Sequence, residues 1–176
     1  LIASLIFSLL AEPVRFLLPM FVKDIYFKGP EAMGLLTTLM GLGSVIASVI
    51  IAGIDANKRG LIWIIGGFIT GGSLLTLAIS DSYVISMVVM IFMGASDSIR
   101  RTLSMSIMME KTRPDLRGRI MSIYMLNWGL IPLGALPAGI VADIIGAQST
   151  IGILSILLVI SSVVVLITQK ELRNVN

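Results

Sequence analysis

Five charged residues interrupt two long apolar segments of this 176-residue chain. Glu12 and Arg15 stand three residues apart, about halfway along the first segment. Asp97 precedes Arg100 by three residues and Arg101 by four, about halfway along the other segment. On a helix these spacings place side chains on one face, so each carboxylate can meet an arginine. The chemistry that such groups support in an apolar setting is binding of a polar or anionic group and protonation of a carboxylate.

A charge at the centre of a bilayer costs from about 2.5 to over 10 kcal/mol, so these five side chains cannot face lipid. Two interpretations are open. The charges can be internal pairs that hold a bundle together, or they can line a polar cavity for a substrate or coupling ion. Three arginines against two carboxylates leave one positive charge unmatched, which favours an anionic partner. Asn127, in the middle of a further apolar segment, is a weaker candidate for the same cavity.

The elements that must position these residues are membrane-spanning helices. Hydrophobic residues make up 56% of the chain and charged residues 13%, and the mean hydropathy is +1.01. A helix of about 20 residues crosses the hydrocarbon core, and six apolar stretches of that length occur. They are about 1–22, 32–54, 61–80, 83–109, 118–142 and 149–168. Because these stretches are apolar on every face, we predict an all-α integral membrane domain with six transmembrane helices and no barrel strands.

Basic residues between the spans indicate the topology. If the first span runs outward, the inner loops and the tail hold eight basic residues and the outer loops hold two. The eight are Lys58, Arg59, Lys111, Arg113, Arg117, Arg119, Lys170 and Arg173, and the two are Lys23 and Lys28. Positive charge collects on the cytoplasmic side, so we expect a multi-pass protein of the cytoplasmic membrane with both ends of the segment cytoplasmic. The net charge of +3 is mostly this topology signal, and we expect no nucleic-acid partner.

The chain contains neither Cys nor His. That composition excludes a disulfide framework, a thiolate nucleophile, a Cys/His zinc site and an imidazole base. An intramembrane hydrolase would need a Ser/His pair, paired aspartates or a metal. A phosphate-binding Gly-x-x-x-x-Gly-Lys-Ser/Thr loop is also absent. We therefore expect no enzyme activity, no metal, no cofactor and no nucleotide-driven transport.

Two stretches carry a family resemblance. Residues 113–122 read RPDLRGRIMS, and residues 132–143 read PLGALPAGIVAD, followed by IGA at 145–147. They resemble the tenth-to-eleventh loop and the eleventh helix of a major facilitator superfamily transporter. Residues 97–101, DSIRR, resemble its tenth span. The similarity covers nearly the whole chain, with the six spans matching spans seven to twelve, and is closest to the enterobactin-exporter-like branch.

The resemblance implies one half of a twelve-helix fold, in which two six-helix halves enclose a central cavity. The first and fourth helices of the C-terminal half line that cavity, and here they carry the five charges. By analogy, the family function is proton-coupled efflux of a small molecule by alternating access. In a chain without His, Glu12 and Asp97 are the protonatable candidates. The chain starts at Leu1 within an apolar run, so we expect a fragment whose partners are a missing N-terminal half, the bilayer, a small-molecule substrate and protons.

Two loops are expected to take part in gating. Asp55 and Arg59 belong to a segment that keeps only the Asp, the basic pair and the Gly of the family pattern Gly-x-x-x-Asp-Arg/Lys-x-Gly-Arg. Arg117 and Arg119 belong to the later loop. The degenerate first pattern leaves open whether Asp55 and Arg59 form a charge latch. An alternative function for the whole chain is a structural or scaffold membrane subunit without its own transport pathway, in which all five midspan charges are internal pairs.

Overall fold

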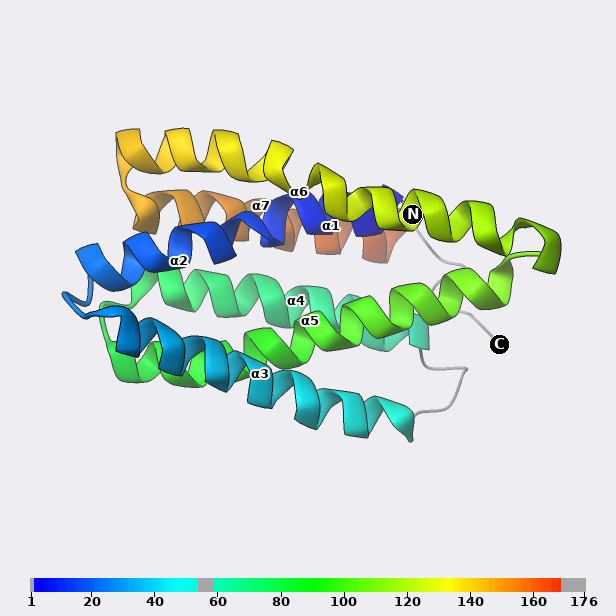
Figure 1. The fold of residues 1–176 in the computed structure, drawn as a ribbon, viewed down its shortest axis with the longest axis horizontal. Helices are drawn as coiled ribbons and strands as arrows, with labels where there is room; N and C mark the ends of the chain where they lie inside the picture. Colours follow the sequence, from blue (N-terminus) through cyan, green and yellow to red (C-terminus); the bar gives the residue numbers. More distant parts are fainter. Residues whose placement is uncertain (1, 54–58, 169–176) are drawn as a thin grey trace.

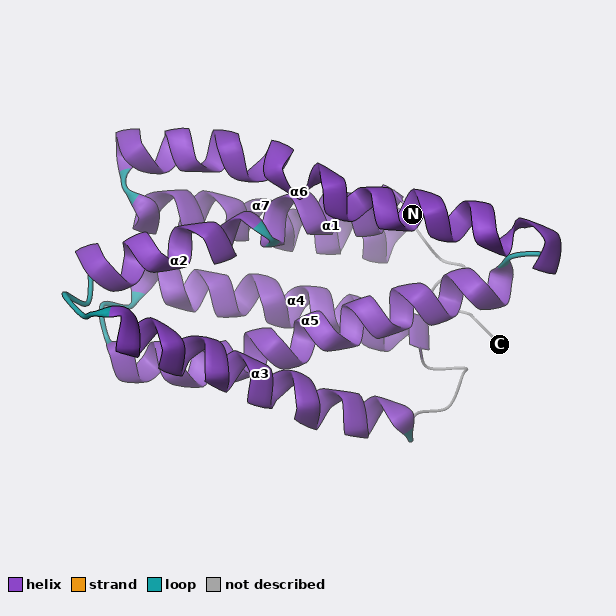
Figure 2. Ribbon diagram, in the orientation of Figure 1, coloured by secondary structure: helices purple, strands orange, loops and turns teal. Residues whose placement is uncertain are grey.

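The computed structural model describes residues 2–53 and 59–168, and nearly all of them are helical (Figure 2). The helices are α1 (Ile2–Ala11), α2 (Pro13–Asp24), α3 (Pro30–Ala52), α4 (Arg59–Ile79), α5 (Tyr83–Lys111), α6 (Arg117–Ile145) and α7 (Ala147–Thr168), with a short 3-10 turn, η2 (Pro114–Leu116), before α6. The described residues contain no strand.

Six helical segments among the described residues are long and apolar enough to cross a membrane. They are Leu5–Asp24, Pro30–Ala52, Gly60–Ile79, Tyr83–Glu110, Pro114–Ile145 and Ala147–Ile167. Successive spans run in opposite directions, so α1 begins and α7 ends at the same end of the bundle (Figure 1). The predicted all-α bundle of six transmembrane helices is thereby confirmed.

The first span, expected as one helix, is interrupted where its charges lie. Pro13 has no N–H and cannot continue the hydrogen-bond pattern to the carbonyl of Leu9. The helical pattern holds up to the break, where the Glu12 N–H donates to the Ser8 carbonyl at 3.1 Å. Just after the break, the Arg15 N–H makes a tighter i→i−3 bond to the Glu12 carbonyl at 3.0 Å. The interruption is therefore one residue long, and it separates α1 from α2 at Glu12.

Helix α6 covers the interruption at a close contact. A Cβ atom added to Gly134 would lie 2.8 Å from the Leu9 carbonyl oxygen, which is the oxygen that Pro13 leaves without its helical donor. Only a glycine allows the α6 backbone to approach so near. Pro132 and Pro137 flank this contact within α6, and the α6 ribbon changes direction about halfway along (Figure 1).

Helices α3 and α5 form the closest pair in the bundle. A Cβ atom on Gly43 would lie 2.0 Å from the Ile91 carbonyl oxygen, and one on Gly94 would lie 1.9 Å from the Met40 carbonyl oxygen. The two backbones therefore touch at two points, each created by a glycine. Helix α5 packs against α4 on its other side, and α4 packs against α7. Helix α5 is thus fixed from both sides at the level of Asp97.

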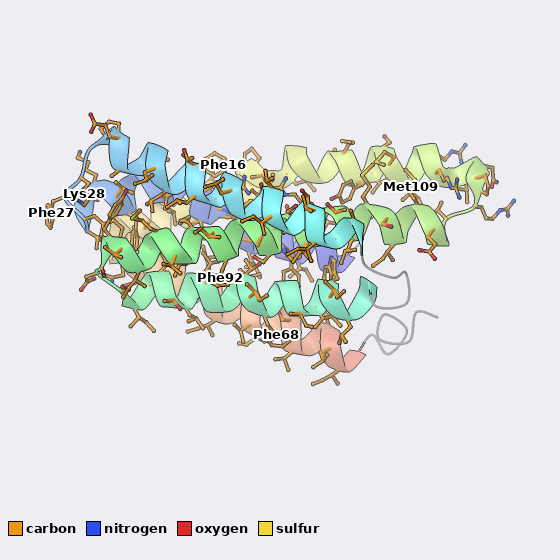
Figure 3. All side chains as sticks on the ribbon, turned by 90° about the horizontal axis from the view of Figure 1, so that it is seen from below. Phe16, Phe27, Lys28, Phe68, Phe92 and Met109 are labelled. Carbon is orange, nitrogen blue, oxygen red and sulfur yellow. The ribbon has the colours of Figure 1, made fainter. Side chains whose placement is uncertain are left out.

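The interior and the exterior are both apolar, as a membrane bundle requires. Phe7, Leu74 and Leu158 are fully buried in the core. Large apolar side chains such as Phe16 and Phe92 cover the outside, where a soluble protein would carry charge (Figure 3). Helices α3 and α6 are the least covered of the six spans, and they lie at the two edges of the near face of the bundle in Figure 1.

Candidate functional site

The five charges predicted from the sequence form one continuous network between α2 and α5. Glu12, at the interruption between α1 and α2, lies 3.3 Å from Arg15 Nε through its Oε2 and accepts a hydrogen bond from Arg101 Nη2 through its Oε1. The Glu12 residue is only 8% exposed. Two carboxylates and three guanidinium groups are thereby joined across two helices that are far apart in sequence.

Asp97 is the centre of the network because it contacts all three arginines. Its Oδ2 accepts from Arg15 Nη2 at 2.6 Å and from Arg101 Nε at 2.9 Å. Its Oδ1 accepts from Arg100 Nη2 at 3.3 Å. Charge-assisted hydrogen bonds of this kind are among the stronger ones in proteins. Removing the Asp97 carboxylate would therefore leave three cations short of a partner at once.

The three arginines occupy different environments. The Arg100 side chain is 8% exposed, its guanidinium carbon lies 5.1 Å from the centre of the Phe7 ring, and its Nε has no hydrogen-bond partner. The Arg15 and Arg101 side chains are 41% and 28% exposed. Arg100 therefore contacts Asp97 from the protein interior, whereas Arg15 and Arg101 are open to a molecule that approaches from outside the bundle.

That molecule would enter a groove of about 520 Å³ between α2, α3 and α5. Its lining residues are Arg15, Leu18, Met33, Thr37, Met40, Gly41, Ser44, Gly94, Asp97, Ser98, Arg101 and Thr102. The α5 side of the groove carries charged and hydroxyl side chains. The α3 side carries small residues and the thioethers of two methionines. Its volume is of the size that a small organic molecule needs.

The comparison with known families decides the class of protein. The profile of the Major Facilitator Superfamily matches residues 1–175. This chain belongs to the major facilitator superfamily. A "Staphyloferrin A transporter" from Staphylococcus aureus is 24% identical over 159 residues, which cover 89% of this chain and 40% of that protein. The chain therefore spans less than half the length of this relative. No solved structure matches.

Membership of the superfamily indicates a transporter rather than an enzyme. Together with the six apolar helices, it supports the expected multi-pass membrane protein. The structure brings Glu12, Arg15, Asp97, Arg100 and Arg101 together through ion pairs, and their role in a substrate or coupling-ion cavity stays a prediction. Arg15, Asp97 and Arg101 line the groove, whereas Arg100 and Glu12, predicted for the same cavity, are not among its lining residues. The backbone of Asn127 lies in α6, but its side chain falls outside what the structure describes.

The predicted gating residues of this superfamily member lie away from the charge network. Arg117 and Arg119 are exposed at the start of α6, and Arg117 Nε donates to the Thr112 carbonyl at 3.4 Å. Asp55 lies outside the described residues. Arg59 begins α4, and its side chain is not described. The gating role of all four residues stays a prediction.

Sequence reasoning missed the α3 wall of the groove and the ring behind Arg100. Thr37, Gly41 and Ser44 recur at spacings of four and three, so they share a helix face and could have been found as a polar stripe. Phe7 carried no such signal, because an apolar residue in an apolar span is ordinary. Its role depends on Arg100, which lies 93 positions later in the chain.

Proposed function

We propose that this chain is the C-terminal six-helix half of a secondary active transporter that exports a small molecule with proton coupling by alternating access. The single observation that carries the proposal is the open charged groove, in which Arg15, Asp97 and Arg101 face a space of about 520 Å³. The superfamily match and the 40% coverage of the staphylococcal relative support a half of a longer transporter. The missing N-terminal half would cover the groove.

The charge balance supports an anionic substrate. The network holds three cations and two carboxylates, and its two more exposed members, Arg15 and Arg101, are cations. A guanidinium group binds carboxylates and phosphates in a planar fork. We therefore assign Arg15 and Arg101 to the substrate, Arg100 to the support of Asp97, and Glu12 and Asp97 to proton exchange. The staphylococcal relative carries the name of a staphyloferrin A transporter, and the enterobactin-exporter-like branch stays part of this proposal.

We further propose the cytoplasmic membrane as the location, with both ends of this segment on the cytoplasmic side, on the strength of the asymmetry in basic residues. Helices α3 and α6, the least covered spans, are the surfaces that the second half would contact. The bilayer would cover the remaining apolar exterior.

A scaffold without its own pathway is the competing function, and one observation favours it. All five charges are paired with one another. A purely structural network would also be sealed from any cavity, because a bundle gains nothing from exposing its ion pairs. The 41% exposure of Arg15 and the groove beside it argue for transport instead.

The test is made in the full-length protein. Asp97→Asn and Arg101→Ala should each abolish transport into inverted membrane vesicles, assayed with a panel of small organic anions that begins with staphyloferrin A. Both variants should still insert into the membrane. Matched controls are Asp115→Asn and Arg113→Ala, which remove an exposed pair on the loop before α6, 3.2 Å apart between Arg113 Nη2 and Asp115 Oδ2. Wild-type transport by both groove variants would refute the proposed site.

A further inference from the structure

Phe27, in the loop between α2 and α3, combines an unfavourable backbone conformation with an exposed apolar side chain. Its φ angle of 51° lies in the left-handed region, and among the described residues it is the one non-glycine residue with a positive φ. An aromatic residue in that conformation is strained, and glycine is the usual choice. Its apolar side chain is also 87% exposed. The ring is thus left almost uncovered by the described part of the chain.

The loop is nevertheless fixed on both sides of Phe27. The Lys28 N–H donates to the Val22 carbonyl at 3.2 Å, which closes the end of α2. Tyr26 is buried, and its ring meets the Tyr83 ring edge to face at 5.6 Å between centres. Lys28 Nζ lies 5.0 Å from the centre of the same Tyr83 ring. The strained residue is therefore held in place and projects from the end of the molecule (Figure 3).

The position of the loop relates Phe27 to the groove. Helices α2 and α3, which the loop joins, supply two walls of the groove through residues such as Leu18 and Met33. Phe27 does not line the groove, but its loop lies at the end of α3 where Met33, one turn after Pro30, lines it. It also follows Asp24, where the first span ends, and precedes Lys28, so it lies beyond the segment that meets the hydrocarbon core.

We propose that Phe27 is a closing contact of the transport cycle, whose ring packs on an apolar surface of the second six-helix half when this end of the groove closes. This inference rests on the proposed function. Strain is maintained at switch regions where another state recovers its cost, and burial of a phenylalanine ring is a large apolar gain. The chain covers 40% of the staphylococcal relative, which supports the second half that the proposed function assumes.

The experiment uses the full-length protein, in proteoliposomes, with Phe27→Cys as the labelling site. This chain has no native cysteine, so only cysteines elsewhere in the protein need replacement. A membrane-impermeant maleimide reports accessibility with and without an imposed pH gradient. Thr37→Cys, on the α3 wall of the groove, is the control position. The cysteine reports whether position 27 itself becomes buried, so we expect a lower labelling rate at position 27 in the condition that closes this end of the groove.

Each outcome decides a different claim. A change at position 37 with none at position 27 overturns the closing contact and leaves the proposed transport cycle intact. Unchanged labelling at both positions overturns the alternating-access cycle and the contact with it. Slow labelling at 27 under both conditions, with quenching of an attached fluorophore by brominated lipid, shows a membrane anchor and overturns the contact.

A second pair of variants separates the ring from the strain. Phe27→Gly relieves the left-handed backbone, so the melting temperature of the purified protein should not fall, whereas transport should slow roughly tenfold because the ring is lost. Phe27→Leu keeps an apolar side chain and should retain more transport than Phe27→Gly. Transport by Phe27→Gly at the wild-type rate overturns the proposal.

Discussion

The contact between α3 and α5 gives the sharpest structural prediction. A methyl group on Gly94 would lie 1.9 Å from the Met40 carbonyl oxygen, whereas carbon and oxygen atoms in close helix contacts stay about 3.3 Å apart. The obstacle is a backbone atom, which cannot rotate away as a side chain would. Gly94→Ala must therefore push α3 and α5 apart by more than about 1 Å.

The energy of that displacement can be set against the intrinsic gain from alanine. Replacing glycine by alanine inside a helix stabilises by up to about 1 kcal/mol. Overpacking a close contact costs about 1–3 kcal/mol, and an immovable backbone places this site at the upper end. We expect Gly94→Ala to lower the free energy of unfolding by about 1–2 kcal/mol after both effects are counted. Gly43→Ala, 2.0 Å from the Ile91 carbonyl oxygen, should behave in the same way.

The assay is equilibrium unfolding of the full-length protein in detergent, with transport measured in parallel. Gly72→Ala is the matched control, because a Cβ at that position of α4 meets nothing within 4 Å and should be neutral or stabilising. Gly94 lies one turn before Asp97 and lines the groove, so separation of the helices should also slow transport. If Gly94→Ala proves as stable as Gly72→Ala, the two backbones do not touch and the reasoning about this helix pair is wrong.

Two further predictions concern groups near the ends of the spans and beside the charge network. Burial, reinforced by Asp81, raises the pKa of Tyr26 above its usual value of 10.0, although a hydrogen bond with Ser86 opposes the shift. Because Tyr26 then ionises first in the unfolded chain, the free energy of unfolding should fall as pH rises above about 10. Tyr26→Phe should remove that part of the pH dependence of unfolding. Trp63→Phe removes the indole N–H that donates to Ser104 Oγ at 2.7 Å, so the free energy of unfolding should drop by about 1 kcal/mol or more while transport continues. Loss of transport in a stable, folded variant would contradict this purely structural role.

Much of the fold follows from the sequence because the signals are local. Six apolar stretches and the charged loops between them are read residue by residue, and the membrane requires each stretch to satisfy its own backbone as a helix. The interruption at Glu12 also has a local signal, Pro13, but the overall apolar character of the span predicts one continuous helix. The partner of the freed Leu9 carbonyl could not be predicted, because Gly134 lies 125 positions away and many glycines could have filled that place.

The sequence indicates which five residues carry the buried or midspan charge, but not which arginine faces the protein interior and which two face the groove. Spacings of three and four brought Arg100 and Arg101 near Asp97. Adjacent residues on a helix point about 100° apart, so these two arginines had to face different surroundings. Which one faces the interior depends on what packs there, and that is set by Phe7 on α1. The sequence of α5 alone carries no record of that neighbour.

The geometry of the network also limits how its members can act. Arg15 and Arg101 each contact both Glu12 and Asp97, so an anion that binds these two arginines competes with both carboxylates at the same time. Asp97 would then retain Arg100 behind it, whereas both of the arginines that contact Glu12 would be engaged by the anion. The two acids are therefore unequal although both belong to one cluster. Because Arg100 contacts Asp97 and not Glu12, release of Arg15 and Arg101 to an anion would leave Asp97 with one arginine and Glu12 with neither of its two.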